Sequence, residues 1–183
     1  MQRFLLKLAR GCEALNEAVG RLLAWLTLFM VLVTFLVVVL RYAFDLGWIA
    51  MQESITYMHA VLFLGAAAYT LKHQGHVRVD IYYRRFSERG RAWVDLLGTL
   101  LLLVPVCVFI FAIGWDYVAE SWSLQEGSRE AGGLPGVWLL KTMILVMPVL
   151  MILQGVALAV RALLVLRGVI DRLEAPLPAG EAK

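Results

Sequence analysis

Four long runs of apolar residues dominate the chain, and no charged residue interrupts any of them. They cover residues 22–40, 54–71, 96–115 and 142–160. About 20 apolar residues in a helix span the hydrocarbon core of a bilayer, and a helix satisfies its backbone groups where no water is present. The runs lack the alternation that a transmembrane β-strand requires. The pattern therefore predicts an all-α integral membrane protein, a four-helix bundle with its membrane domain at 22–166.

A different pattern precedes the first run. Apolar residues recur there at spacings of three or four, with basic residues between them: Phe4, Leu8, Cys12, Leu15, Val19 and Leu22. This periodicity predicts a separate amphipathic helix over 1–21 that lies in the cytoplasmic interface. The run that follows is longer than the apolar core of a signal peptide, so it is interpreted as a permanent span. Residues 167–183 are predicted to form a partly disordered cytoplasmic tail.

Basic residues are distributed unevenly between the two sides of the predicted spans. Of the 17 lysines and arginines, 14 lie in the N-terminal segment, in the loop between the second and third runs, or in the C-terminal tail. The other three are Arg41, Arg129 and Lys141. Because basic loops stay in the cytoplasm, both termini are predicted to be cytoplasmic.

Composition narrows the class of protein further. Hydrophobic residues make up 61% of the chain and charged residues 17%, which excludes both a soluble globule and a disordered chain. The net charge of +3 belongs to residues that flank apolar runs, so it indicates membrane orientation and not nucleic-acid binding. The two cysteines, Cys12 and Cys107, form no CxxC motif and are interpreted as packing residues.

The sequence lacks the motifs of an enzyme, a metal site or a cofactor site. It has no nucleotide-binding glycine loop, zinc-protease motif or GxSxG elbow. His59 is the only histidine inside an apolar run, so it cannot supply both axial ligands of a haem, and it is interpreted as a hydrogen-bond donor to a neighbouring helix. His73, His76 and Asp80 offer too few ligands for a metal on their own. We expect a non-enzymatic protein without a cofactor.

The centres of the runs contain no charged residue of the kind that marks an ion or substrate path. Small residues and one amide stand out instead and predict faces for close packing of a neighbouring subunit: Gly65, Ala66, Gln154, Gly155 and Ala159. A transport role for Gln154 is the alternative to an interhelical contact. The pattern favours an accessory membrane subunit over an independent transporter.

Two basic residues at the predicted outer boundary, Arg41 and Lys141, need an explanation. Arg41 ends the first run and Glu53 precedes the second, so the two are predicted to form an ion pair; the alternative is an arginine that reaches the lipid headgroups. Lys141 either reaches the headgroups in the same way or contacts an acid of the preceding loop or of a partner. The tryptophans nearby are typical of an aromatic belt, and they are Trp48, Trp115, Trp122 and Trp138.

Several short stretches, taken in order, resemble a known family. They are Arg41-Tyr42-Ala43-Phe44, Trp48 with Glu53, Phe63-Leu64-Gly65-Ala66-Ala67, Gly75-His76-Val77-Arg78-Val79-Asp80, and Leu134-Pro135-Gly136-Val137-Trp138 followed by Pro148. With four spans and short loops, this order resembles the small membrane subunit, of the DctQ type, of the tripartite ATP-independent periplasmic (TRAP) transporters. The resemblance covers roughly residues 20–160.

The resemblance implies a non-catalytic subunit in the bacterial inner membrane. Its partners would be lipid, a large membrane subunit that holds the sodium and substrate sites, and a periplasmic binding protein that delivers an organic anion, often a carboxylate. On this basis the charged residues of the outer loops are candidates for docking the binding protein: Asp45, Glu120, Glu126, Arg129, Glu130 and Lys141. The alternative function is the membrane anchor of a respiratory complex that holds a quinone or a haem.

Overall fold

The chain is entirely helical within the part that the computed structural model describes, residues 2–77 and 81–173. The helices are α1 (Gln2–Ala43), α2 (Ile49–Gly65), α3 (Ala67–Lys72), α4 (Glu88–Gly98), α5 (Val104–Ser123) and α6 (Val137–Leu166), with a 3-10 turn η1 (Tyr83–Arg85) and a π-helical turn η2 (Thr99–Leu103). This confirms the predicted all-α fold class.

Four helical segments are long and apolar enough to cross a membrane. They are Arg3–Ala43, Ile49–Lys72, Glu88–Ser123 and Val137–Leu166, so each contains one of the predicted spans. The second consists of α2 and α3, which meet at Ala66, and the third consists of α4, η2 and α5. The chain is therefore a multi-pass membrane protein.

The third segment contains a wide turn just before its proline. Pro105 cannot donate a hydrogen bond to the carbonyl of Leu101, and its ring would clash with that carbonyl in a regular α-helix. The π-helical turn η2 includes Leu101 and relieves this conflict locally. Pro148 lies inside α6 and is buried, and the helix continues past it.

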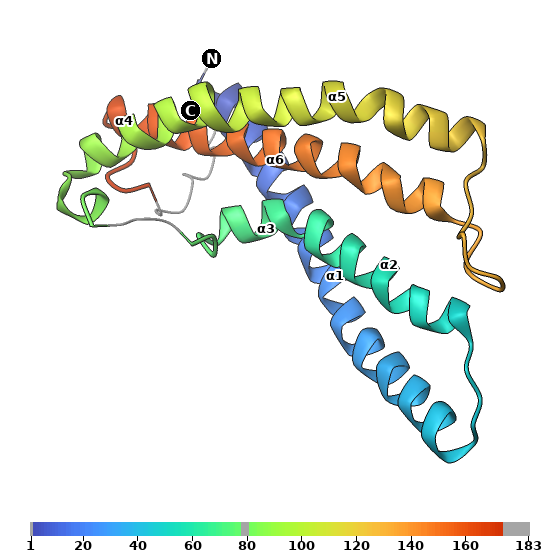
Figure 1. Ribbon diagram of the computed structural model, residues 1–183. Helices are drawn as coiled ribbons and strands as arrows, with labels where there is room; N and C mark the ends of the chain where they lie inside the picture. The colour runs from blue at the N-terminus through green and yellow to red at the C-terminus, as the bar shows by residue number, and fades with distance from the viewer. Residues whose placement is uncertain (1, 78–80, 174–183) are drawn as a thin grey trace.

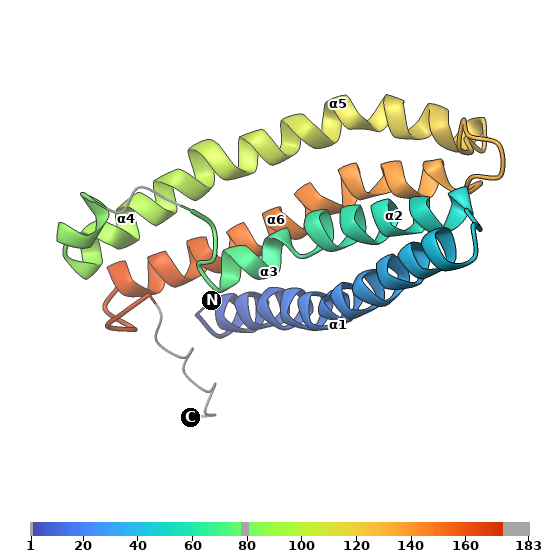
Figure 2. The same cartoon turned by 60° about the horizontal axis from the view of Figure 1, so that its bottom comes forward.

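α6 is the central helix, because it contacts α1, α2, α3, α4 and α5. Across the molecule the long helices follow the order α1, α2, α6, α5, as Figure 2 shows. The α1–α2 hairpin diverges from the α5–α6 pair toward one end, so the four helices spread there like a fan (Figure 1). The spread leaves long helix faces without cover from the chain itself.

The buried core lies at the end where the helices converge. Its members come from the first turns of α1, from α4, from the second half of α6 and from the segment that follows: Leu6, Ala9, Cys12, Ala92, Leu96, Ala157, Val160, Ala162, Leu164, Val165 and Ile170. The most apolar stretch of α1 contributes no buried residue at all. We call the converging end the core end, and the opposite end, which holds residues 124–136, the loop end.

The N-terminal segment differs from its prediction in two ways. Residues 2–21 continue directly into the first span as one helix, and the face that packs on α6 is not the most apolar one. Phe4, Leu15 and Leu22 are exposed, whereas the buried residues, apart from Leu6, are small or polar. On the side of α3, an added Cβ on Gly20 would lie 2.2 Å from the Tyr69 ring, so only a small residue allows this approach. The interfacial location of this segment stays a prediction.

Candidate functional site

At the loop end, one carboxylate holds the loop between α5 and α6. Glu53, in the first turns of α2, accepts a hydrogen bond from the Ser128 hydroxyl and another from the Leu134 amide at 2.6 Å. The Ser128 amide donates to the Leu134 carbonyl at 2.9 Å, which closes the loop on itself. Gly133 must be a glycine, because an added Cβ would lie 2.4 Å from the Ser128 hydroxyl. Glu53 therefore fixes the loop to α2.

A second carboxylate joins the loop to the start of α6. Glu126 accepts hydrogen bonds from Lys141 and from the Ser121 hydroxyl, the latter at 2.7 Å. These two donors hold the pKa of Glu126 below its ordinary value, since they stabilise the ionised carboxylate. The Lys141 ammonium also lies 3.9 Å from the centroid of the Tyr117 ring. Of the two explanations for Lys141, the structure therefore shows the contact with a loop acid.

Aromatic side chains tie α5 to α6 next to these carboxylates. The rings of Trp122 and Trp138 pack edge to face with centroids 4.3 Å apart. The Trp122 indole donates to the Thr142 hydroxyl at 2.8 Å. Two of the four tryptophans expected in an aromatic belt thus also join the two helices.

The predicted ion pair between Arg41 and Glu53 is not formed. Among the residues that the structure describes, no ion pair involves either side chain, and Glu53 binds Ser128 and Leu134 instead. Arg41 is exposed at the end of α1. The prediction was wrong because the loop between α5 and α6 folds back over Glu53 and supplies both hydrogen bonds to its carboxylate.

The candidate docking residues fall into two groups. Four are exposed at the loop end: Asp45, Glu120, Arg129 and Glu130. The other two, Glu126 and Lys141, are partly buried and bind each other. The second pair therefore joins the loop to α6, and only the first group is exposed on the surface.

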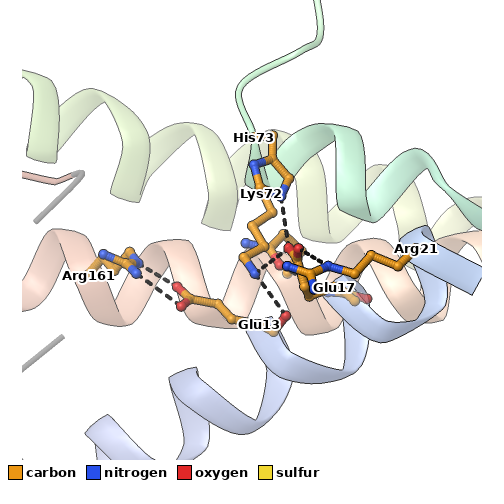
Figure 3. A network of polar contacts seen from close by, with 8 residues as sticks. Glu13, Glu17, Arg21, Lys72, His73 and Arg161 are labelled. Atoms are coloured by element: carbon orange, nitrogen blue, oxygen red, sulfur yellow. Dashed lines mark hydrogen bonds and ion pairs between the residues drawn. The ribbon is translucent and has the colours of Figure 1, made fainter. Parts of the chain in front are cut away.

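At the core end, Glu17 of α1 collects three positively charged or basic neighbours (Figure 3). Its carboxylate accepts hydrogen bonds from Lys72 at 2.8 Å, from His73 at 2.8 Å and from Arg21 at 2.8 Å. Lys72 is the last residue of α3 and His73 follows it, so this cluster joins α1 to the end of α3. The Lys72 ammonium also donates to the Glu13 carbonyl at 3.2 Å.

One turn earlier on α1, a bidentate ion pair joins α1 to α6. Both guanidinium nitrogens Nε and Nη2 of Arg161 bind the Glu13 carboxylate, the second at 3.0 Å. Only 17% of the Arg161 side chain and 13% of the Glu13 side chain are exposed, and Arg161 also donates to the Leu173 carbonyl at 3.1 Å. A bidentate arginine–carboxylate pair fixes orientation as well as distance. It sets the register of α1 on α6.

Above this pair, two buried amides meet between the same helices. The Asn16 side-chain amide donates to the Gln154 carbonyl oxygen at 3.0 Å, and both side chains are about 1% exposed. Gln154 thus makes the interhelical contact, which was one of its two interpretations. Its partner lies within the chain.

The small residues also pack within the chain, which corrects their prediction. An added Cβ on Gly65 would lie 2.5 Å from Leu23 of α1, and one on Gly155 would lie 2.8 Å from Leu103 of η2. Ala159 packs against the core, and Ala66 is partly buried where α2 meets α3. Gly65 and Gly155 therefore do not form a face for another subunit.

The remaining positions of the family-like stretches are spread along the molecule. Tyr42 and Trp48 are 82% and 65% exposed on either side of the first hairpin turn. The His76 imidazole lies 3.1 Å from the Ala67 carbonyl, and Pro135 is exposed in the loop. Asp80 lies outside the described residues. His59 has no hydrogen bond within residues 2–77 and 81–173, so the neighbour expected for it is not in this part of the chain.

Three residues were not predicted from the sequence although they form ion pairs or hydrogen bonds between α1 and its neighbours: Glu13, Asn16 and Glu17. A signal was present, because two acids four residues apart share one helix face within a basic segment. Acids in such a segment need cations nearby, and Arg161 and Lys72 each end an apolar run at the same side of the membrane.

Taken together, these groups join helices and loops to one another. Among the described residues, no set of three or more His, Cys, Asp or Glu side chains is arranged to hold a metal ion. Residues 30–165 match the model of the family described as "Tripartite ATP-independent periplasmic transporters, DctQ component". No curated protein and no solved structure matches the chain.

Proposed function

The chain belongs to the DctQ component family of the tripartite ATP-independent periplasmic transporters, and we propose that it braces the large membrane subunit without transporting substrate itself. Membership makes it a small permease subunit, associated with a large membrane subunit and with a substrate-binding protein. The observation that supports a bracing role is the use of its polar groups. Glu13, Glu17 and Lys141 form ion pairs inside the chain, and the four apolar runs contain no charge.

We further propose that the complete transporter takes up an organic anion, a carboxylate, driven by a sodium gradient. The small subunit would contribute no sodium ligand, because its four apolar runs contain no carboxylate and the side-chain carbonyl of Gln154 already accepts from Asn16. It would lie in the inner membrane with the core end in the cytoplasm and the loop end in the periplasm. The distribution of basic residues, 14 against 3, supports that orientation.

The loop end is the proposed contact for the binding protein. Its exposed charges are mostly acidic, and the loop between α5 and α6, which carries Arg129 and Glu130, is held by Glu53 and Glu126. Exposed charges at the rim of an interface mainly change the association rate and its dependence on salt. A rigid platform presents them without the entropic cost of ordering a loop.

Neutralising the exposed acids tests the docking role. In a complex with Asp45→Asn, Glu120→Gln and Glu130→Gln, we expect the association rate of the binding protein to change and to depend less on salt. Asp171→Asn is the matched control, because Asp171 is an exposed acid at the core end. An unchanged salt dependence in the triple variant would exclude docking at these residues.

Co-purification tests the bracing role itself. We expect the large subunit and this chain, expressed together, to purify as one complex with a fixed ratio. The large subunit alone should lose stability or aggregate when this chain is omitted. A large subunit that purifies and remains equally stable without this chain would contradict the proposal.

A further inference from the structure

One face of α2 carries polar side chains that point away from the rest of the chain. Gln52, Thr56 and His59 are all exposed, and their spacing of four and three residues places them in one line along the helix. Phe63 continues the line at 71% exposure, and its ring stacks on His59 with centroids 6.1 Å apart. α2 lies between α1 and α6, as Figure 2 shows, so this line occupies the surface that neither neighbour covers. We call these four residues the α2 polar face.

The α2 polar face has unsatisfied hydrogen-bonding groups. Within residues 2–77 and 81–173, no hydrogen bond is found for the side chain of any of its three polar members. The exposed threonines of α1 differ in this respect. Thr27 and Thr34 each donate to a carbonyl of their own helix, both at 2.6 Å. Exposure in a span therefore does not by itself leave a hydroxyl without a partner in this chain.

The depth of these groups makes their exposure costly. His59 is the sixth of the 18 residues in the apolar run 54–71, so it lies within a predicted span. Lipid tails neither donate nor accept hydrogen bonds, and an exposed imidazole at that depth needs a polar partner. A headgroup or water could reach Gln52 near the start of the helix, but His59 lies two turns further into it.

We propose that the α2 polar face is the contact with a transmembrane helix of the large subunit, and that this helix places a hydrogen-bonding side chain opposite His59 and Thr56. The proposal rests on the proposed function, which supplies a membrane partner. The exposed face of α1 does not require a hydrogen-bonding partner, because its large side chains are apolar and the hydroxyls of Thr27 and Thr34 donate to carbonyls of the same helix. That face suits lipid, while the α2 polar face suits a protein that offers donors and acceptors.

Photo-crosslinking in the purified complex of this chain with its large subunit tests the location. Replacing Phe63 by p-benzoyl-phenylalanine puts a probe on the α2 polar face, and the same replacement of Phe35, which is 68% exposed on α1, is the matched control. We expect an adduct with the large subunit from position 63 and none from position 35. An adduct between two copies of this chain, adducts with lipid alone, or a protein adduct only from position 35 would overturn the proposal.

A matched set of substitutions tests the hydrogen bonds. We expect Thr56→Val with His59→Leu to weaken retention of the large subunit in detergent by roughly three- to tenfold, since interhelical hydrogen bonds in membranes are of modest strength. Thr34→Val on α1 should leave retention unchanged, and His59→Gln should recover part of the loss. The thermal stability of the isolated chain should be the same in the Thr56→Val, His59→Leu double variant as in the wild type, because neither side chain has a hydrogen bond within residues 2–77 and 81–173.

The two tests also separate this inference from the function on which it rests. If the large subunit never co-purifies with the wild-type chain, the proposed function fails and this inference fails with it. If the complex forms but retention is the same in the double variant as in the wild type, the assigned face is wrong and the bracing function stands.

Discussion

At the core end, the carboxylates of Glu13 and Glu17 join helices to each other, whereas at the loop end those of Glu53 and Glu126 hold a loop in place. The core end uses charged partners on regular helices, with Arg161 of α6 and Lys72 of α3 shielded from solvent. The loop end uses mostly neutral donors, including a backbone amide.

The difference between the two ends follows from what each set of carboxylates holds, helices at the core end and a loop at the loop end. Charge pairs between helices are strong only where they are shielded and well oriented, and the core end meets both conditions. A loop that must present charge to a soluble partner needs a fixed shape but no deep burial. We therefore expect the core end to contribute more to stability and the loop end to fix the shape of the surface.

The largest effect should come from breaking the ion pair at the core end. Arg161→Ala leaves the shielded Glu13 carboxylate without its bidentate partner, so we expect a loss of about 3 kcal/mol in the free energy of unfolding. Tryptophan fluorescence during thermal unfolding in detergent would measure it. Arg41→Ala is the control, since Arg41 is an exposed arginine with no ion pair among the described residues. Equal losses in the two variants would show that the pair between Glu13 and Arg161 contributes no more to stability than an exposed arginine.

A smaller and more local effect should follow from Glu53→Gln at the loop end. This change keeps the size of the side chain but weakens its bonds to the Ser128 hydroxyl and the Leu134 amide. We expect faster amide hydrogen exchange in residues 128–134, with a smaller loss of global stability than in Arg161→Ala. Exchange that stays as slow as in the wild type would mean that Glu53 does not hold the loop.

The smallest effect should be the pH dependence contributed by Glu126. Its pKa is lowered in the folded protein, so the folded state binds fewer protons there than the unfolded state. The resulting stabilisation is present above the ordinary pKa of about 4.5 and is lost as the pH falls through the folded-state value. Stability measured against pH should therefore fall less steeply on the acid side in Glu126→Gln, and also in Lys141→Met, which removes the main cause of the shift. A wild-type slope in both variants would contradict this assignment.

Much of the fold could be predicted because a membrane imposes a simple rule on the sequence. An uninterrupted apolar run of about 20 residues must be a helix in a bilayer, and all four runs lie in such helices. The contact between Lys141 and a loop acid was also among the alternatives, since the short loop before α6 carries both Glu126 and Glu130.

The packing between helices could not be predicted in the same way. In a soluble helix the most apolar face is the buried one, but in a membrane apolar residues can face lipid, so hydrophobicity does not distinguish inside from outside. That is why Phe4 and Leu15 are exposed while Asn16 is buried. It is also why Gly65 and Gly155 indicated close packing correctly but not which helix they would meet. The ion pair expected for Arg41 failed because the α5–α6 loop, distant in the sequence, supplies the partners of Glu53.

Uptake by reconstituted components tests the central claim most directly. Vesicles should contain the large subunit with or without this chain, or this chain alone, and the binding protein and a labelled carboxylate should be added with a sodium gradient. The account predicts uptake only when both membrane subunits and the binding protein are present. Uptake by this chain alone, or undiminished uptake when it is left out, would contradict the claim that it braces the transporter.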